Sequence, residues 1–263
     1  MNAKPGDLQG MKPELFDQFN AQQIGKLPPS AMGGFMPAQM AMVPPEAMQG
    51  FTAGQFQQLD PKAVGAFQPK QVGQLPPKVM AAMTEAQFGA LPPTAFAGFN
   101  PNQVKVLPPK FFGMLDPSEI LQMAPAAMDG LTGQQIMRMA PGLLKSLVPK
   151  QIAAIKPAAI DDLTQQQLAA FTPQQARGFT PAQLQAFSDQ QENALPQTFV
   201  NALTPEQKAA LNDAVVATPV APVTPVMPSN PVPPTVPGVS TALQSLHPFG
   251  NSNGFVSSAG FGG

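Results

Sequence analysis

One octad decides the fold of this chain: LTPEQKAA at residues 203–210. Thr204 can accept hydrogen bonds from the free N–H groups of a helix start, and Pro205 suits the first helical position. Gln207 lies three residues after Thr204, which completes a capping box. The octad therefore predicts a short helix that begins at Pro205 and follows the apolar Leu203.

The same octad frame repeats 27 times from Ala3 to Thr218 without an insertion or deletion. The first position is apolar in every octad, and the third is proline in 19 of them. The sixth position is a large apolar residue except at Ala176, Glu192 and Lys208. Self-similarity at a short fixed period is typical of a repeat solenoid.

The prolines exclude one continuous helix. A proline inside a helix costs about 3 kcal/mol and biases the preceding residue away from the helical conformation. A β-solenoid is the alternative, but strands in a buried coil tolerate little proline. We therefore predict an all-α solenoid of short helices, about one turn each, built from octad repeats over residues 3–218, with the first and sixth positions in its core.

Two longer rhythms overlie the octads. In the first half of the array, octads of an LPPxA(M/F) type, such as residues 91–98, alternate with octads that carry Gln at the fifth position, such as residues 99–106. We interpret the structural unit as a pair of short helices. Proline is also missing from the third position at intervals of four octads, which we interpret as either one coil turn or a duplication unit. The positions form two trios: Ala21, Ala53 and Glu85, then Gly133, Gln165 and Gln197. Asp189 and Asp213 also replace this proline, but they lie where the repeat decays and break the four-octad interval.

The composition changes beyond the array. Residues 219–237 are rich in Pro, Val, Ala and Thr, which predicts an extended polyproline II linker. Residues 238–263 form a low-complexity Gly/Ser/Phe tail that we expect to be disordered, with an export or anchoring element as the alternative. Residues 1–7 lack a basic region followed by an apolar core, so we expect no cleaved secretory signal.

Charge and cysteine content narrow the classes of partner. The net charge is −1 and only 11% of residues are charged, so no global field attracts nucleic acid or an anionic membrane. The chain has no Cys, which excludes disulfides and Cys-based metal sites. No apolar run approaches the roughly 18–20 residues needed to cross a bilayer. We predict no nucleic-acid partner and no membrane span.

Candidates for catalysis are few. The single His, His247, lies in the tail, where nothing ordered would position it for proton transfer. No Cys nucleophile exists, and no Ser has a plausible His base. Asp161 and Asp162 come nearest to an acidic cluster, and we interpret them as a solvated turn and not as metal ligands. We predict no enzyme, no catalytic, cofactor-binding or metal-ligating residue, and no cofactor.

Five lysines share the fourth position of the octad: Lys62, Lys70 and Lys78 in successive octads, then Lys110 and Lys150. Equivalent positions stack into rows in a solenoid, so these side chains could form a basic ribbon. The alternative, which we favour, is that the fourth position is simply exposed and accepts any residue. The 15 methionines fall mostly at the two core positions, where Met is an adaptable filler.

The octad LTQQQLAA at residues 163–170 resembles the tandem LTxxQ(I/V/L)xA octads of large bacterial exported and surface proteins, often described as adhesin-like or haem-utilisation/adhesion exoproteins. Residues 203–210 agree except at Lys208, whereas residues 27–130 depart towards LPP and NPxQ variants rich in Met and Phe. The resemblance implies a surface or secreted structural role and carries over no catalytic or ligand residue. Octads that open with LTPEQ also resemble the repeats of DNA-reading plant-pathogen effectors, but the different period and the net charge disfavour DNA reading.

The sequence thus predicts a non-enzymatic structural or interaction protein. We expect a cell-surface or secreted spacer, adhesive or matrix element, with a protein or cell-surface partner and possible self-association. The alternative is an intracellular, cytoplasmic solenoid scaffold that binds peptide or protein partners. The location of the protein discriminates between the two.

Overall fold

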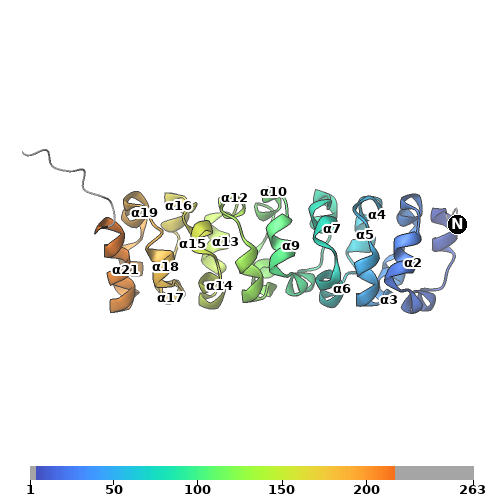
Figure 1. Ribbon diagram of the computed structural model, residues 1–263, viewed down its shortest axis with the longest axis horizontal. Helices are drawn as coiled ribbons and strands as arrows, with labels where there is room; N and C mark the ends of the chain where they lie inside the picture. Colours follow the sequence, from blue (N-terminus) through green and yellow to red (C-terminus); the bar gives the residue numbers. More distant parts are fainter. Residues whose placement is uncertain (1–3, 217–263) are drawn as a thin grey trace, which may run out of the picture. The chain divides into compact units, whose positions relative to one another are not determined.

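A computed structural model of the chain describes residues 4–216. These residues fold into short helices joined by bends, with no strand among them. The helices follow one another along the array as successive turns of a coil (Figure 1). The prediction of an all-α solenoid is confirmed over the β alternative. The predicted linker at 219–237, the predicted tail at 238–263 and His247 lie outside the described residues.

The helices have four to six residues, except for the last, which has twelve. Five are 3₁₀ helices: η1 (Pro13–Gln18), η2 (Pro29–Gly34), η3 (Pro45–Gly50), η4 (Pro93–Gly98) and η5 (Pro125–Gly130). The α-helices are α1 (Pro5–Gln9), α2 (Ala21–Lys26), α3 (Pro37–Met42), α4 (Ala53–Gln57), α5 (Pro61–Val64), α6 (Pro69–Gln74), α7 (Pro77–Ala81), α8 (Glu85–Phe88), α9 (Pro101–Val106), α10 (Pro109–Phe112), α11 (Pro117–Gln122), α12 (Gly133–Ile136), α13 (Pro141–Ser146), α14 (Pro149–Ala153), α15 (Pro157–Ile160), α16 (Gln165–Leu168), α17 (Pro173–Ala176), α18 (Pro181–Leu184), α19 (Asp189–Ala194), α20 (Gln197–Ala202) and α21 (Pro205–Val216).

Many helix starts follow the predicted capping chemistry, whereas others, such as η4 after Pro92, have no side-chain cap. Helix α9 begins at Pro101, and the preceding Asn100 accepts the Gln103 N–H at 3.1 Å through its side chain. The Asn100 N–H donates in return to Gln103 Oε1 at 3.0 Å. The helix ends at Val106. The next residue, Leu107, has an extended backbone that turns the chain, and its N–H donates to the Val104 carbonyl. Apart from α21, which continues into the next octad, each octad is therefore one short helix and one bend, and many of the helices carry a cap of this kind.

Each coil turn contains three octads. Helix α9 packs against α7, which begins three octads before it, and against η5, which begins three octads after it. The other packed pairs of helices are also three octads apart, except for α19 and α21. Successive octads therefore lie in three different stacks. The 27 octads make about nine turns. The interpretations of a helix pair as the unit and of four octads as a coil turn are wrong. A duplication unit of four octads stays a prediction.

Part of the alternation of two octad types instead coincides with two kinds of helix. Between residues 13 and 57, 3₁₀ helices alternate with α-helices. Helices η2 to η5 carry a buried Ala at the fifth position and end in Gly at the eighth. A Cβ at Gly98, for example, would overlap the backbone of Pro69 in the turn before. The glycines therefore permit the close approach of neighbouring turns.

The first and sixth positions fill one continuous core, as predicted. Phe96, Phe99, Val104 and Leu107 are at most 4% exposed. Ala176 is also buried, so a small residue fills its sixth position. Only near the end of the described array do polar side chains enter this row, at Glu192 and Lys208, which are half-buried.

Candidate functional site

The most regular chemical feature of the array is the glutamine at the fifth position. Gln103 is fully buried, and its Oε1 accepts the N–H of Asn100, which caps its own helix. Its Nε2 donates to the carbonyl oxygens of Val72 at 2.7 Å and Leu75 at 2.8 Å. Those two carbonyls flank a bend in the preceding turn of the coil. One side chain thus joins three segments of the coil.

This arrangement recurs along the array and forms what we call the glutamine ladder. Each member is at most 7% exposed, accepts from the residue three positions before it, and donates to two carbonyls of an earlier turn. Both N–H groups of every amide are therefore satisfied, as a buried amide requires. The members are Gln39, Gln55, Gln71, Gln87, Gln103, Gln135, Gln151, Gln167, Gln175, Gln183, Gln191 and Gln207.

Glu119 takes the ladder position in α11. Its carboxylate accepts the Asp116 N–H at 2.9 Å, so the helix cap is kept. A carboxylate has no N–H to donate to the carbonyls of the preceding turn. Burial raises the pKa of Glu119, the Asp116 N–H lowers it, and the negative charge of Asp116 raises it further. The ladder is therefore interrupted at this turn.

A second half-buried carboxylate lies near the end of the described array. Glu192 occupies the sixth, core-facing position of its octad, and its Oε1 is buried without a hydrogen-bond partner among the described residues. Burial raises the pKa of this carboxyl, and the nearby charge of Asp189 adds to the effect. Since polar residues are typical of the last turns of a solenoid, we regard Glu192 as a terminal polar residue of the core.

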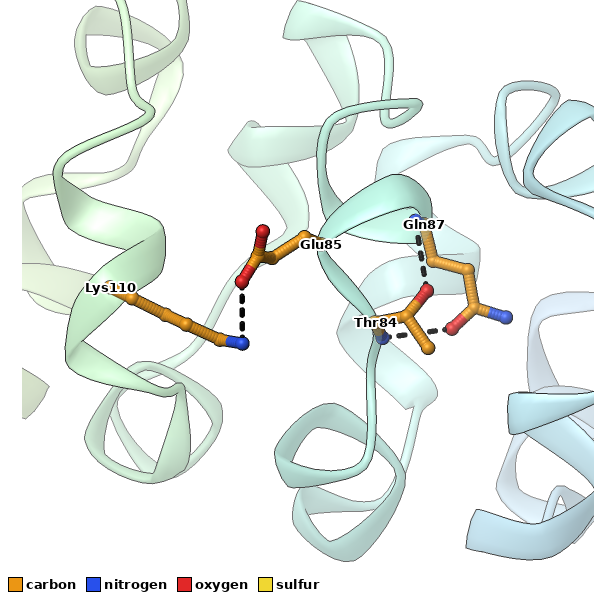
Figure 2. Close-up of polar contacts among 4 residues, drawn as sticks. All are labelled: Thr84, Glu85, Gln87 and Lys110. Carbon is orange, nitrogen blue, oxygen red and sulfur yellow. Dashed lines mark hydrogen bonds and ion pairs between the residues drawn. The ribbon is translucent and has the colours of Figure 1, made fainter.

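The five lysines of the fourth position do not form a ribbon. All five are exposed, which is the interpretation we favoured. Because a turn holds three octads, Lys62, Lys70 and Lys78 fall in three different stacks. Lys110 contacts the preceding helix of its own stack, where its Nζ lies 2.6 Å from a carboxylate oxygen of Glu85 (Figure 2). Of the five, Lys110 thus makes a local ion pair within its own stack.

The acidic pair has a structural role. The backbone carbonyl of Asp161 accepts Gln191 Nε2 at 2.7 Å, which places it in the ladder. The side chain of Asp162 occupies the space where a Cβ at Gly133 would lie. Gly133 is the only glycine at the third position of an octad, so it makes room for this carboxylate. Within residues 4–216, no three His, Cys, Asp or Glu side chains are grouped to hold a metal ion.

The largest cavity described lies at the first turn of the array. It measures about 670 Å³ and is lined by Leu8, Met11, Phe19 and Leu27 together with polar neighbours. Other cavities, such as one of about 280 Å³ beside Asp129 and Lys156, lie along the sides of the coil. None of the helices in the described part of the chain is long and apolar enough to span a membrane.

Sequence reasoning identified the cap formed by the fifth-position glutamine but missed its two donor bonds. The capping box already accounted for the residue, so nothing demanded a further role. The sequence did contain a signal for these bonds: Gln recurs at the fifth position, although Glu would cap the helix equally well. No protein-family model matches the chain, and no curated protein is significantly similar to it.

Proposed function

We propose that this protein is a non-enzymatic structural element, a spacer, adhesive or matrix component that acts at the cell surface or outside the cell. The observation that carries the proposal is the glutamine ladder. Each of its members joins one octad to the bend of an earlier turn through two hydrogen bonds. The bonds link successive turns, so the coil is held along its length as well as through its core.

The packing supports a role as a spacer. In a solenoid each repeat contacts only its neighbours, so length can grow without a new kind of core. Here the buried first and sixth positions continue from turn to turn, and the ladder adds satisfied polar contacts in the same direction. Such an array keeps a fixed distance between its two ends.

The surface location is supported by the resemblance of residues 163–170 to the octads of exported and surface proteins. The few charged groups on the array are dispersed, as at Lys110 and Glu85, which pair with each other. A surface of this kind has no field that would direct it to nucleic acid. We therefore expect the array to interact with a protein or a cell surface and not with nucleic acid.

The second candidate is an intracellular scaffold that binds peptide or protein partners. Exposed apolar side chains favour it: Leu121 is 46% exposed and Val148 is 42% exposed. Leu121 and Val148 hold the same octad positions, at the same spacing, as Gly73 and Asn100. The side chain of Asn100 donates to the Gly73 carbonyl at 3.4 Å, so these two positions lie side by side on adjacent turns. Leu121 and Val148 therefore share a bend of the coil. An apolar peptide side chain could dock there.

Protease shaving of intact source cells tests the proposal. Peptides released from the array, while a cytoplasmic marker stays protected, are the expected result. A fully protected array would overturn the surface proposal and favour the scaffold. In that case a pull-down with the array, compared with an L121K variant, would show whether the apolar bend binds the partner.

A further inference from the structure

The glutamine ladder is not spread evenly over the three stacks of the coil. In two of the stacks, no two consecutive turns between residues 39 and 183 lack a ladder Gln. In the third stack three consecutive turns lack one, because the fifth positions of η4, α11 and α13 carry Ala95, Glu119 and Leu143. These three helices pack on one another in this order. One corner of the coil is therefore joined over several turns without ladder hydrogen bonds.

Glu119, in the middle of this gap, differs from its two apolar neighbours. Ala95 and Leu143 are buried and bring no polar group to the preceding turn. A ladder Gln donates to the carbonyls 31 and 28 residues before it, and the equivalent carbonyls for Glu119 belong to Phe88 and Leu91. We call the contact between Glu119 and these two carbonyls the α11 joint. One oxygen of Glu119 holds the helix cap at 2.9 Å, which leaves the other in the place of the amide nitrogen of a ladder Gln.

The protonation of Glu119 decides what this oxygen does. When the carboxyl is ionised, the oxygen can only accept, and it repels the carbonyl oxygens of Phe88 and Leu91. When it is protonated, its O–H takes the place of one N–H of a ladder Gln and donates to a carbonyl. The Phe88 carbonyl already accepts the Leu91 N–H at 3.1 Å, whereas the Leu91 carbonyl accepts no hydrogen bond among the described residues. The Leu91 carbonyl is therefore the acceptor for the proton.

The ionisable groups around the joint direct a proton to Glu119. Helix η4 has no ionisable side chain, and α13 has only Lys145, which is exposed. Asp116, at the start of α11, accepts from the hydroxyl and N–H of Ser118 and from the Glu119 N–H, and these bonds lower its pKa. Burial raises the pKa of Glu119, the Asp116 N–H lowers it, and the charge of Asp116 raises it again. Asp116 thus stays ionised while Glu119 takes the proton.

We propose that the α11 joint is a pH-sensitive switch, closed when a protonated Glu119 donates to the bend of the preceding turn and loose when Glu119 is ionised. In the loose state the apolar core alone joins the turns at this corner, through residues such as Ile120. The neighbouring turns of the same stack have no ladder bond to compensate. The coil can therefore bend at this corner, and acidification stiffens it. The proposal goes beyond the function proposed above and holds wherever the protein resides.

Distances between pairs of spin labels test the proposal in the full chain. The sequence contains no Cys, so labels attach only where a Cys is introduced. The pair T94C and G142C spans the α11 joint, and both residues are exposed at the fourth positions of η4 and α13. The pair K78C and A126C, also 48 residues apart and exposed, spans the intact ladder bonds of Gln103 and is the matched control.

At about pH 8 the distances across the joint should be broadly distributed, and at about pH 4 they should narrow to the width of the control pair. In the E119Q background the distribution should be narrow at both pH values. In the E119A background it should have one width at both, because Ala brings neither a charge nor a donor. An unchanged width in the parent chain, or a pH response that persists in E119A, would overturn the proposal.

Hydrogen exchange at one neutral pH gives a second test that needs no change of pH. The Leu91 N–H donates to the Phe88 carbonyl inside the joint, and the Leu75 N–H holds the equivalent place beside the intact bonds of Gln103. E119Q should slow the exchange of the Leu91 amide about tenfold and leave the Leu75 amide unchanged. Equal exchange of the Leu91 amide in the parent chain and E119Q would show that the joint is not loose, and the proposal would be wrong.

Discussion

At the scale of single residues, the fifth position of the octad determines how the turns are joined. The sequence predicted the Gln oxygen as a helix cap, and Thr180 and Gln183 form that cap as expected. The two bonds from Gln183 Nε2 to the Ile152 and Ile155 carbonyls were not foreseen. They depend on which octads lie next to one another, and a local motif does not contain that information.

The interruption of the ladder at Glu119 leads to the first prediction. E119Q supplies the missing N–H groups and should raise the free energy of unfolding by about 1–2 kcal/mol at neutral pH, for two recovered hydrogen bonds. Urea unfolding of the two proteins measures the difference. Q103E, which removes the same donors from an intact rung, is the reciprocal control and should lower stability.

The pH dependence of this difference has a definite sign. Burial raises the pKa of Glu119 above its ordinary value of 4.5, so the folded state holds the proton more tightly than the unfolded state. The contribution of Glu119 is fully present below about pH 4.5 and is lost as the pH rises through the folded-state pKa. The advantage of E119Q should therefore shrink on acidification. An advantage that grows towards low pH would contradict the assignment.

Close approach between turns gives a second prediction at this scale. G98A should lower the free energy of unfolding by about 1–3 kcal/mol, because a Cβ there overlaps the backbone of Pro69. G54A is the matched control: it lies in α4, and nothing lies within 4 Å of an added Cβ. It should stabilise the helix by about 0.5–1 kcal/mol. Thermal unfolding compares the two, and similar losses would refute the role of Gly98.

At the scale of the element, the octad is one short helix and one bend, except in α21, which continues into the next octad. Proline and the capping residues were sufficient to predict where helices begin, as at Pro101. They did not predict which octads would be 3₁₀ helices. That choice accompanies the buried Ala95 and the Gly98 contact with the neighbouring turn, so it depends on packing between turns.

The octad frame predicts the result of a one-residue insertion. An extra residue after Pro101 moves Gln103 and Val104, both fully buried, out of their positions in α9. The loss should be about 2–5 kcal/mol, comparable to truncation of a large core side chain. N102K changes only the exposed fourth position and should be neutral within about 0.5 kcal/mol. Equal melting temperatures for the two variants would be evidence against an octad core.

At the scale of the whole array, the period and the core positions were predictable and the number of octads per turn was not. The first and sixth positions mark the core whatever the coil's circumference. Composition pointed to groups of two and four octads, while packing places Pro77, Pro101 and Pro125 in one stack at intervals of three. One feature of the sequence could have indicated the interval of three octads. Gly133 leaves space for the side chain of Asp162, and Asp162 belongs to the octad three positions later, which stacks on the octad of Gly133.

This geometry predicts which deletions the array tolerates. Removal of residues 75–82, one whole octad, leaves every later residue in its core or surface position, and the variant should unfold cooperatively. Removal of residues 75–78 moves the following residues by half an octad and should abolish cooperative unfolding through the neighbouring turns. Calorimetry of both variants checks the prediction. Similar behaviour of the two would show that the octad is not the packing unit.

The three-octad turn also has a consequence for how such a gene can change. Gain or loss of one octad preserves the core, yet it rotates everything downstream by a third of a turn, so that Lys110 would move to the stack that now carries Lys70 or Lys78. Gain or loss of three octads changes length alone. Variation in the number of octads can therefore change this protein in two separable ways. Steps of three octads change its length alone, whereas single octads also change the side of the coil on which the downstream residues lie.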